Sequence, residues 1–212
     1  MRGIGKLLLV ILIAHPRPTI YIVEACICPS EHLIKTQRLN LEPMTREYFD
    51  IFVRDMLTDP KVVEHYHSYR GLFDLQQIRV RAEKDFWEHF EESRDSKGFE
   101  IWSLFEGLAD PELESFVGWA GLLQSSISDQ YGGPELQYMI ASRASGQGFA
   151  TEAASAVMDD ASARKLTPKV IATVDIPNLG SIRVLEKLKF DFVGQIDAYG
   201  SSDMYLYTKE LD

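Results

Sequence analysis

Two glycines directly before a helix-forming run are the strongest chemical signal in the chain. Residues 143–150 read Arg-Ala-Ser-Gly-Gln-Gly-Phe-Ala, and residues 151–158 favour a helix. Glycine lets the backbone turn sharply and approach a ligand without interference from a Cβ atom. The first N–H groups of a helix lack partners within it and lie at the positive end of its dipole. This segment therefore predicts a binding site for an anion such as phosphate.

The spacing of the glycines excludes two common phosphate motifs. A Walker loop ends in Gly-Lys-Ser/Thr, and the dinucleotide fingerprint needs a third glycine and an acidic residue about twenty positions later. The segment instead resembles the acyl-CoA pyrophosphate loop of the GNAT superfamily of N-acetyltransferases, Arg/Gln-x-x-Gly-x-Gly/Ala, which Arg143, Gly146 and Gly148 match without a gap. The alternative is a glycine turn that merely begins a helix.

Two further segments resemble the same superfamily. Residues 178–190 resemble its closing segment, Asn-x-x-Ser-x-x-x-Leu-Glu-Lys-x-Gly-Phe, and residues 33–44 resemble a first strand with a Thr-x-Arg-Leu-x-Leu core. Both are typical of the ribosomal-protein N-terminal (RimJ/RimL-like) branch. Three matches in order, over about residues 33–210, identify the chain as a member of this superfamily.

The resemblance implies that acetyl-CoA is the co-substrate and that no metal is used. Backbone N–H groups of one splayed strand would meet the pantetheine arm, the glycine loop would hold the pyrophosphate, and a later helix start would add polar contacts. The implied binding residues are Met139, Ile140, Arg143, Gly146, Gln147, Gly148, Phe149, Ala150, Asn178 and Ser181.

Acetyl transfer to an amine needs a group that accepts a proton from the amine and one that returns a proton to the thiolate. Glu135 is the best placed carboxylate for the first role, acting through water, or it is an exposed residue that opens a strand. Ser181 is the candidate acid, or it caps the helix that follows. Asp129 and Glu100 are reserve candidates for the base.

Two positions depart from the family pattern. Many members have a tyrosine acid at the position of Leu185, so the resemblance moves the acid to Ser181, as proposed for the ribosomal-protein branch. Lys189 stands where a glycine usually ends the helix in the left-handed conformation, and lysine costs roughly 1 kcal/mol more in that geometry.

The acceptor pocket is predicted beside residues 64–70, between the first two helices. Two histidines there are one residue apart, so they point in different directions and are poor joint metal ligands. We expect Tyr66, Tyr69, Phe73 and Trp119 to shape the pocket, although aromatic residues commonly belong to the core. The acceptor is a primary amine, either a protein N-terminus or a small molecule.

The pattern of elements predicts a mixed α/β fold, with a mostly antiparallel sheet of six to seven strands, flanking helices and a splayed central strand pair. Thr45 and Asp74 are expected to cap the first two helices. The helix after the glycine loop lies between two strands, which predicts parallel pairing at that point. Expected strands cover residues 33–41, 99–106, 115–124, 134–141, 169–174, 192–196 and 204–209.

Composition fits one enzyme-sized domain, residues 31–212, preceded by an extension of residues 1–30. The formal net charge of −10 argues against nucleic-acid or anionic-membrane partners and suits a cationic acceptor. The apolar run at 7–14 is too short for a membrane span, but it mimics a signal peptide, so a secreted protein is the alternative if residues 1–25 are one. The use of acetyl-CoA favours a cytoplasmic protein, monomeric or homodimeric, in which deletion of residues 1–30 leaves acetyl-CoA binding intact.

Three functions remain open at this stage. The sequence favours an acetyl-CoA-dependent N-acetyltransferase that works by direct attack of the amine on the thioester. The alternatives are a catalytically silent CoA-binding regulatory domain and a protein that binds another phosphorylated ligand. Asn178 and Ser181 favour the enzyme over the silent domain.

Overall fold

A computed structural model describes residues 32–66, 69, 71–72, 74–107 and 113–211. The expected extension of residues 1–30 lies outside this part, as does Phe73 of the predicted acceptor wall. Both expectations therefore stay predictions.

The described residues form one eight-stranded mixed sheet with the strand order β1-β2-β3-β4-β5-β6-β8-β7. Neighbouring strands are antiparallel except β5 and β6, which are parallel as the intervening helix predicts. Ile34–Lys35 pairs with β2 as a separate short strand, which takes the sheet beyond the expected six to seven strands. The strands are β1 (Ile34–Lys35), β2 (Leu39–Pro43), β3 (Ile101–Glu106), β4 (Phe116–Leu123), β5 (Glu135–Ile140), β6 (Lys169–Asp175), β7 (Asp191–Ala198) and β8 (Ser201–Glu210).

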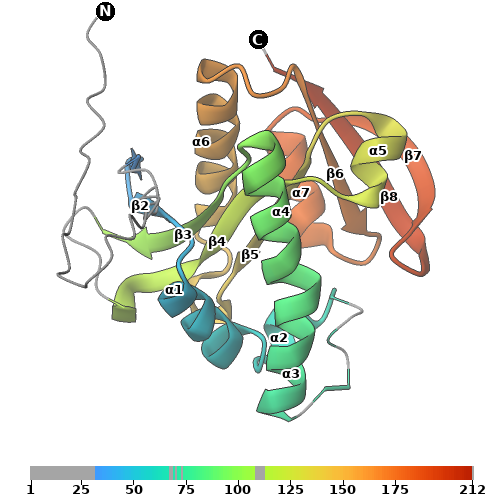
Figure 1. Ribbon diagram of the computed structural model, residues 1–212. Coiled ribbons are helices and arrows are strands. Elements are labelled where there is room, and N and C mark those ends of the chain that lie inside the picture. The colour runs from blue at the N-terminus through green and yellow to red at the C-terminus, as the bar shows by residue number, and fades with distance from the viewer. Residues whose placement is uncertain (1–31, 67–68, 70, 73, 108–112, 212) are drawn as a thin grey trace, which may run out of the picture. The chain divides into compact units, whose positions relative to one another are not determined.

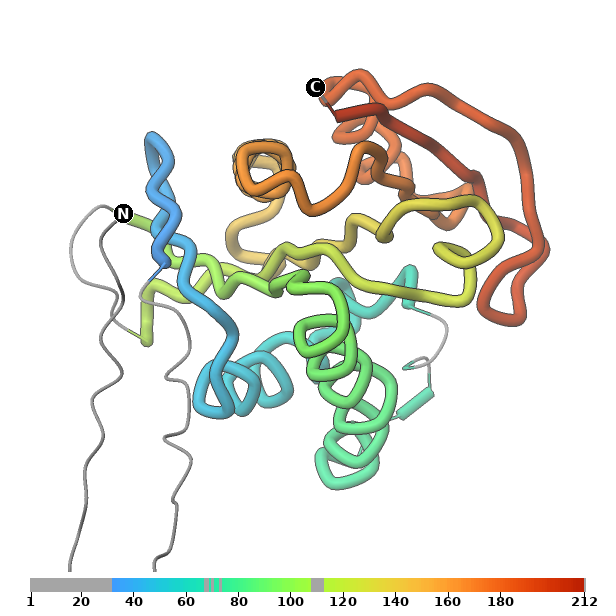
Figure 2. The backbone as a smooth tube through the Cα atoms, turned by 45° about the horizontal axis from the view of Figure 1, so that its top comes forward, coloured from blue at the N-terminus to red at the C-terminus, as the bar shows by residue number. Residues whose placement is uncertain are grey.

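Helices cover both faces of this sheet, with α3 and α4 on one side and α6 on the other (Figures 1 and 2). π-Helical turns extend α1 and join α3 to α4, so each of these stretches is one continuous helix. The helical segments are α1 (Arg46–Ile51), η1 (Phe52–Met56), α2 (Pro60–Val63), α3 (Leu75–Ala82), η3 (Glu83–Trp87), α4 (Glu88–Lys97), η4 (Leu113–Ser115), α5 (Ser126–Tyr131), η5 (Ser142–Ala144), α6 (Phe149–Ala163) and α7 (Leu179–Lys187).

Local sequence signals explain where several helices begin and end. The Thr45 hydroxyl accepts a hydrogen bond from the N–H of Tyr48, and the Asp74 carboxylate accepts one from Gln77, so both predicted caps are confirmed. Gly98 ends α4 in the left-handed conformation. The short helices α2 and α5 were not expected, because neither has room for a repeated apolar pattern.

Alternating residues of the strands feed the two larger of three apolar clusters. Leu122 and Leu136 face α6 and α7, where they join a cluster that includes Val157. Leu123, one position after Leu122, and Met139, three positions after Leu136, face the opposite side of the sheet. They join the cluster under α1, α3 and α4. The central strand β4 is therefore buried along its whole length, whereas the edge strand β7 is largely exposed.

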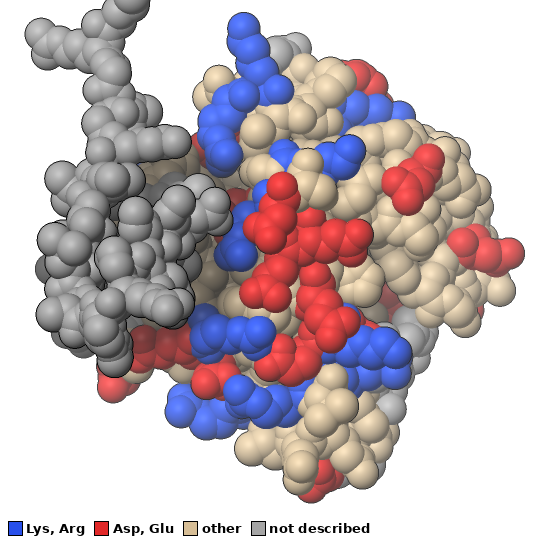
Figure 3. Space-filling model, in the orientation of Figure 1, with Lys and Arg blue, Asp and Glu red and all other residues tan. Residues whose placement is uncertain are grey.

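The outer surface of α4 carries mixed charge. Its acidic side chains gather in the middle of one face, with basic side chains beside them (Figure 3). A solvated helix face with both signs of charge is common in soluble proteins. Among the described residues, no helix is long and apolar enough to span a bilayer.

Candidate active site

The glycine loop and the start of α6 form the predicted anion cradle. Gly146 and Gly148 have φ angles of 78° and 88°, a region that strongly favours glycine. Gly148 is the N-cap residue of α6, and no side chain among the described residues donates or accepts a capping hydrogen bond there. The N–H groups of Phe149 and Ala150 therefore face the loop at the positive end of a 15-residue helix.

Hydrogen bonds from the turn between β1 and β2 hold the first turn of α6. Glu152 accepts hydrogen bonds from the Thr36 hydroxyl at 2.6 Å and from the backbone N–H and Nε of Arg38, each at 2.8 Å. Burial opposes ionisation of Glu152, but these hydrogen bonds outweigh it and hold the pKa of its carboxyl below the ordinary value. The Thr-x-Arg pattern of the first strand was recognised in the sequence, whereas its contact with α6 was not.

Arg38 also contacts the loop itself. Its Nη1 donates to the carbonyl of Gln147 at 2.9 Å, and its guanidinium carbon lies 4.6 Å from the ring centroid of Phe149. The loop is thus fixed at its last residues before any ligand arrives. Preorganised donors bind an anion better than mobile ones, because less ordering accompanies binding.

Arg143 and Gln147 have structural partners in the loop. The Arg143 guanidinium donates to the carbonyls of Glu114 and Phe116, which tie the loop to the start of β4. The amide of Gln147 donates to the carbonyl of Arg143 at 3.3 Å. Contacts of these two side chains with a pyrophosphate stay predictions.

The splayed strand pair is β5 and β6. Their ladder contains a single register pair, Glu135 opposite Ile171, and the N–H of Ile171 donates to the carbonyl of Pro134 at 3.0 Å. Beyond this point the two strands separate. We call this gap in the backbone ladder, next to the glycine loop that follows β5, the opening.

The register shows which N–H groups of β5 face this opening. Ala141 donates to the carbonyl of Val117 on β4, and N–H directions alternate along a strand. The N–H of Met139 therefore also faces β4, because it lies two residues earlier. Tyr138 and Ile140 direct their N–H groups to the opening. The donor role expected of the N–H groups near Met139 and Ile140 stays a prediction, and the register favours Tyr138 and Ile140 over Met139 for it.

Asn178 and Ser181 lie on the α7 side of the opening. Asn178, rather than Ser181, caps α7, because its side-chain oxygen accepts a hydrogen bond from the N–H of Ser181 at 3.0 Å. The Tyr138 hydroxyl lies 3.4 Å from the carbonyl of Ser181. Burial raises the pKa of Tyr138 to about 12, so this hydroxyl stays protonated near neutral pH. Tyr138 was missed, because its position on β5 alone gives no sign of α7.

Glu135 lies on the other face of the opening, in a polar cluster. Its side chain is only 1% exposed, so it is not the exposed strand-opening residue considered as the alternative. The carboxylate accepts hydrogen bonds from the hydroxyls of Thr173 and Tyr199 and from the Gln137 amide. Burial, together with the neighbouring charge of Glu135, raises the pKa of Tyr199.

The three described aromatic residues of the predicted acceptor wall occupy different positions. The Tyr66 hydroxyl lies 3.4 Å from the carbonyl of Tyr138, at the opening, and burial raises its pKa. Tyr69 and Trp119 are 6% and 1% exposed and belong to the core under α3 and α4. Tyr66 alone of the three therefore reaches the opening in this structure, and the acceptor contacts of Tyr69 and Trp119 stay predictions.

The two reserve carboxylates lie away from the opening. Asp129 is exposed on α5 and accepts a hydrogen bond from Gln124 at 2.7 Å. Glu100 packs near Val157, Asp160 and Arg164 in the second half of α6, far along that helix from the glycine loop. Burial raises the pKa of Glu100 to about 7, and this perturbed group is not brought to the site.

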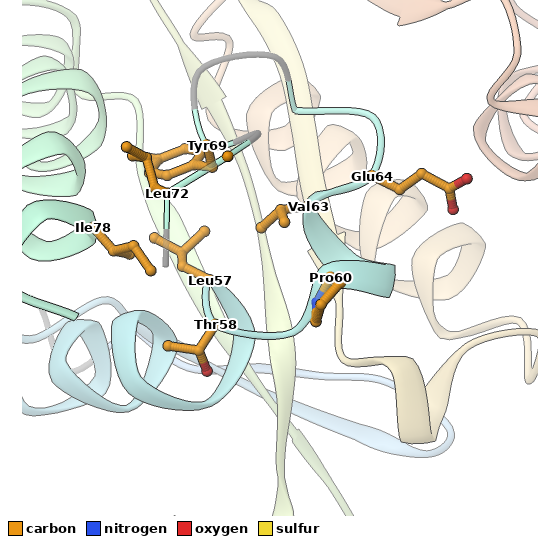
Figure 4. Close-up of a pocket in the computed structure, with 9 residues that line it drawn as sticks. Leu57, Thr58, Pro60, Val63, Glu64, Tyr69, Leu72 and Ile78 are labelled. Carbon is orange, nitrogen blue, oxygen red and sulfur yellow. The ribbon is translucent and has the colours of Figure 1, made fainter. Parts of the chain in front are cut away.

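A separate cavity of about 240 Å³ lies among η1, α2 and α3 (Figure 4). Its walls are mostly apolar, with Leu57, Leu72 and Ile78 pointing towards its centre. Glu64 lines the rim, but its carboxylate points away from these side chains in Figure 4. Of the described residues that line the cavity, only Glu64 and Tyr69 carry an acidic group. No group of three or more potential metal ligands occurs among the described residues.

Comparison with known proteins agrees with this geometry. A family model described as Acetyltransferase (GNAT) domain matches residues 38–191. The chain therefore belongs to the GNAT acetyltransferase family.

Individual relatives add to this assignment. The uncharacterized protein YkkB of Bacillus subtilis (strain 168) is 33% identical over 133 residues, which cover 63% of this chain and 70% of YkkB. An acetyltransferase structure from Agrobacterium tumefaciens strain C58 aligns over 92% of this chain and 99% of its own, with a TM-score of 0.66 and 20% identity.

A structure of RimL, the ribosomal L7/L12 alpha-N-protein acetyltransferase, in complex with coenzyme A also aligns with the chain. The alignment covers 85% of this chain and 99% of the RimL chain, with a TM-score of 0.65 and 13% identity. Likeness at these identities shows the fold, so the GNAT fold expected from the sequence is confirmed.

Proposed function

We propose that this protein is an acetyl-CoA-dependent N-acetyltransferase that acts on a primary amine by direct attack on the thioester. The observation that carries the proposal is the single opening between β5 and β6, which joins three features. The anion cradle lies next to it, Ser181 and Tyr138 lie on one face, and Glu135 lies on the other.

The cradle binds the pyrophosphate of acetyl-CoA through backbone donors. Gly146, Gly148 and the first residues of α6 supply N–H groups that need no particular side chain. The pantetheine arm then enters the opening, where Ile140 and Tyr138 direct their N–H groups outward from β5. These N–H groups hold the pantetheine arm along β5. The thioester then lies between Ser181 on one face of the opening and Glu135 on the other.

Glu135 holds the acceptor amine and receives its proton through water. A buried carboxylate with three hydrogen-bond donors keeps a fixed orientation. The neutral amine attacks the thioester carbonyl, so that a C–N bond forms as the C–S bond breaks. A negative site favours a cationic acceptor and attracts it from solution.

Ser181 returns a proton to the thiolate of CoA. Its backbone N–H is engaged by Asn178, which fixes the start of α7, and its backbone carbonyl lies beside the Tyr138 hydroxyl. Tyr138 assists by hydrogen bonding in its protonated form. Proton donation by positioned groups contributes typically 10²–10⁴-fold to rate.

The acceptor is either a protein N-terminus or a small-molecule amine. Fold likeness to RimL supports the first class, because RimL is a ribosomal L7/L12 alpha-N-protein acetyltransferase. Acetyl-CoA is a cytosolic metabolite, which supports a cytoplasmic enzyme. We propose a monomer or homodimer that uses neither metal nor nucleic acid.

Release of free thiol from acetyl-CoA tests this proposal against panels of peptides, polyamines and aminoglycosides. We expect amine-dependent release by the wild-type protein and roughly 10²–10⁴-fold slower turnover for Ser181→Ala and Glu135→Gln, with little change in acetyl-CoA affinity. Tight acetyl-CoA binding without release on any panel would instead indicate a silent CoA-binding domain. A folded double variant with wild-type turnover would remove both catalytic roles.

A further inference from the structure

His65 and Asp175 form a hydrogen-bonded pair that the roles described above leave unused. Nδ1 of His65 lies 2.9 Å from Oδ2 of Asp175, although 110 residues separate them in the chain. The Asp175 side chain is 4% exposed and that of His65 is 25% exposed. The carboxylate is therefore buried, while the imidazole ring reaches from it to the protein surface.

This pair lies on the Glu135 face of the opening. Asp175 follows Thr173 by two residues on β6, so their side chains point to the same face of the sheet. The Thr173 hydroxyl donates to Glu135. The next residue after His65, Tyr66, reaches the backbone of Tyr138 across the opening. His65 is thus held where an acceptor amine would approach the thioester.

We propose that His65, oriented by Asp175, is a further catalytic residue that takes a proton from the acceptor ammonium group. This inference rests on the proposed function and refines it: His65, rather than Glu135, takes the first proton of the ammonium group, and Glu135 holds the amine. When Nδ1–H donates to Asp175, Nε2 carries the free lone pair. Imidazole ordinarily exchanges protons near neutral pH, and a buried carboxylate stabilises the imidazolium that forms.

The division of labour between His65 and Glu135 follows from their surroundings. Glu135 already accepts hydrogen bonds from three side chains, and its side chain is only 1% exposed. It is therefore suited to hold the ammonium group by charge. His65 is partly exposed, so it can pass a proton to solvent after each turnover.

The protons balance in this scheme. The acceptor ammonium gives one proton to Nε2 of His65, and the neutral amine attacks the acetyl carbonyl. The C–N bond forms and the C–S bond breaks. The second proton leaves the nitrogen and reaches the CoA thiolate by way of Ser181. The products are the acetylated amine and the free thiol, and His65 releases its proton to solvent.

Several titratable groups share this face with His65 and bear on its pH dependence. Burial raises the pKa values of Tyr66 and Tyr199, so both hydroxyls stay protonated near neutral pH. The groups are Asp175 from β6, Glu135 from β5, Tyr199 from the β7–β8 turn, and Tyr66 and Glu64 beside His65 in the chain. The two tyrosines therefore contribute no charge change over the neutral range.

The pH dependence of kcat/KM for the full chain tests the role of His65. We expect His65→Gln to lower kcat at least roughly 10²-fold, to leave acetyl-CoA affinity unchanged and to abolish the acidic limb of the profile. Added imidazole should restore part of the turnover of His65→Ala, which a purely structural defect would not allow. His89→Gln, an exposed histidine on α4, is the matched control and should behave as the wild type.

A nitrogen-detected NMR measurement of the histidine rings tests the geometry without any substrate. We expect the neutral His65 ring to carry its proton on Nδ1, and we expect Asp175→Asn to abolish this preference while turnover falls as in His65→Gln. A wild-type ring protonated on Nε2 would overturn the proposal, as would a His65→Gln variant with normal turnover and an intact acidic limb. If the wild type transfers no acetyl group to any amine, the proposed function fails first, whatever the tautomer.

Discussion

The hydroxyl of Tyr199 donates a hydrogen bond to the carboxylate of Glu135, across 64 residues of sequence. Tyr199 lies in the turn between β7 and β8, so the last hairpin of the sheet completes the polar cluster at the opening. Glu135 is thereby fixed from β6 and from this hairpin at once. The polar cluster, which we propose as the acceptor face of the site, depends on contacts between three separate parts of the chain.

Replacing Tyr199 with phenylalanine should weaken this face. The Glu135 carboxylate would lose one of its donors, and an under-satisfied buried polar group costs roughly 1–3 kcal/mol. We expect a loss of this order in the free energy of unfolding and a lower kcat/KM for the amine, with an unchanged acetyl-CoA affinity. Tyr131→Phe, on exposed α5, is the control. Equal kinetics for both variants would show that Tyr199 has no part in the reaction.

Replacing Gly148 with valine should weaken acetyl-CoA binding. The left-handed conformation at φ 88° is strained by roughly 1–2 kcal/mol for a residue with a Cβ atom, and the side chain would stand at the cradle. We expect at least tenfold lower affinity by calorimetric titration. Gly98 has a φ of 70° at the C-terminal end of α4, away from the cradle, so Gly98→Val carries similar strain and is the control. This variant should lower stability without lowering acetyl-CoA affinity. Unchanged affinity in folded Gly148→Val would refute the pyrophosphate assignment.

Replacing Arg38 with glutamine should loosen the cradle. The side chain is 43% exposed, so its ion pair with Glu152 contributes only about 1 kcal/mol or less to stability. Its contact with the Gln147 carbonyl should matter more for binding, because the loop would no longer be preorganised. We expect several-fold weaker acetyl-CoA binding and a nearly unchanged free energy of unfolding. Arg81→Gln, which breaks an exposed pair with Asp85, is the control and should leave affinity unaltered.

Replacing Glu100 with glutamine should stabilise the protein in a pH-dependent way. Burial raises the pKa of this carboxyl from 4.5 to about 7. Between these values the unfolded chain loses the proton and the folded chain keeps it, so stability falls as pH rises through this window. Relative to the wild type, the variant should gain roughly 1–3 kcal/mol at about pH 8 and little of this at about pH 4. Urea unfolding at both pH values measures it, and an equal gain at both would contradict a shifted pKa.

The fold was predictable because its signals are local. Two caps, the glycine loop and the run of strands all lie within short windows of sequence, and they appear close to where they were expected, except that the strand expected over 33–41 is divided into β1 and β2. Even the departure at Lys189 follows the pattern. Lys189 has a φ of 59° at the end of α7, so it adopts the left-handed conformation in which the family usually has glycine.

The contacts of the site were less predictable, because they join distant segments. Nothing near Arg38 in the sequence points to Glu152, and nothing near His65 points to Asp175, since only the folded sheet brings them together. The direction of the N–H at Met139 likewise depends on register with β4, which a single strand does not reveal. Alternation along a strand gives the face of a side chain but not its partner.

The central claim is that this site moves an acetyl group from CoA to an amine. Acetyl-CoA labelled with ¹³C at the acetyl carbonyl follows that transfer directly by NMR, with the full-length protein and the amine that gives the fastest thiol release. The account predicts that the thioester signal decays as an amide signal of the acceptor grows at the same rate, and that Ser181→Ala slows both. Label that stays in the thioester with every amine, or that appears only as acetate, would contradict it.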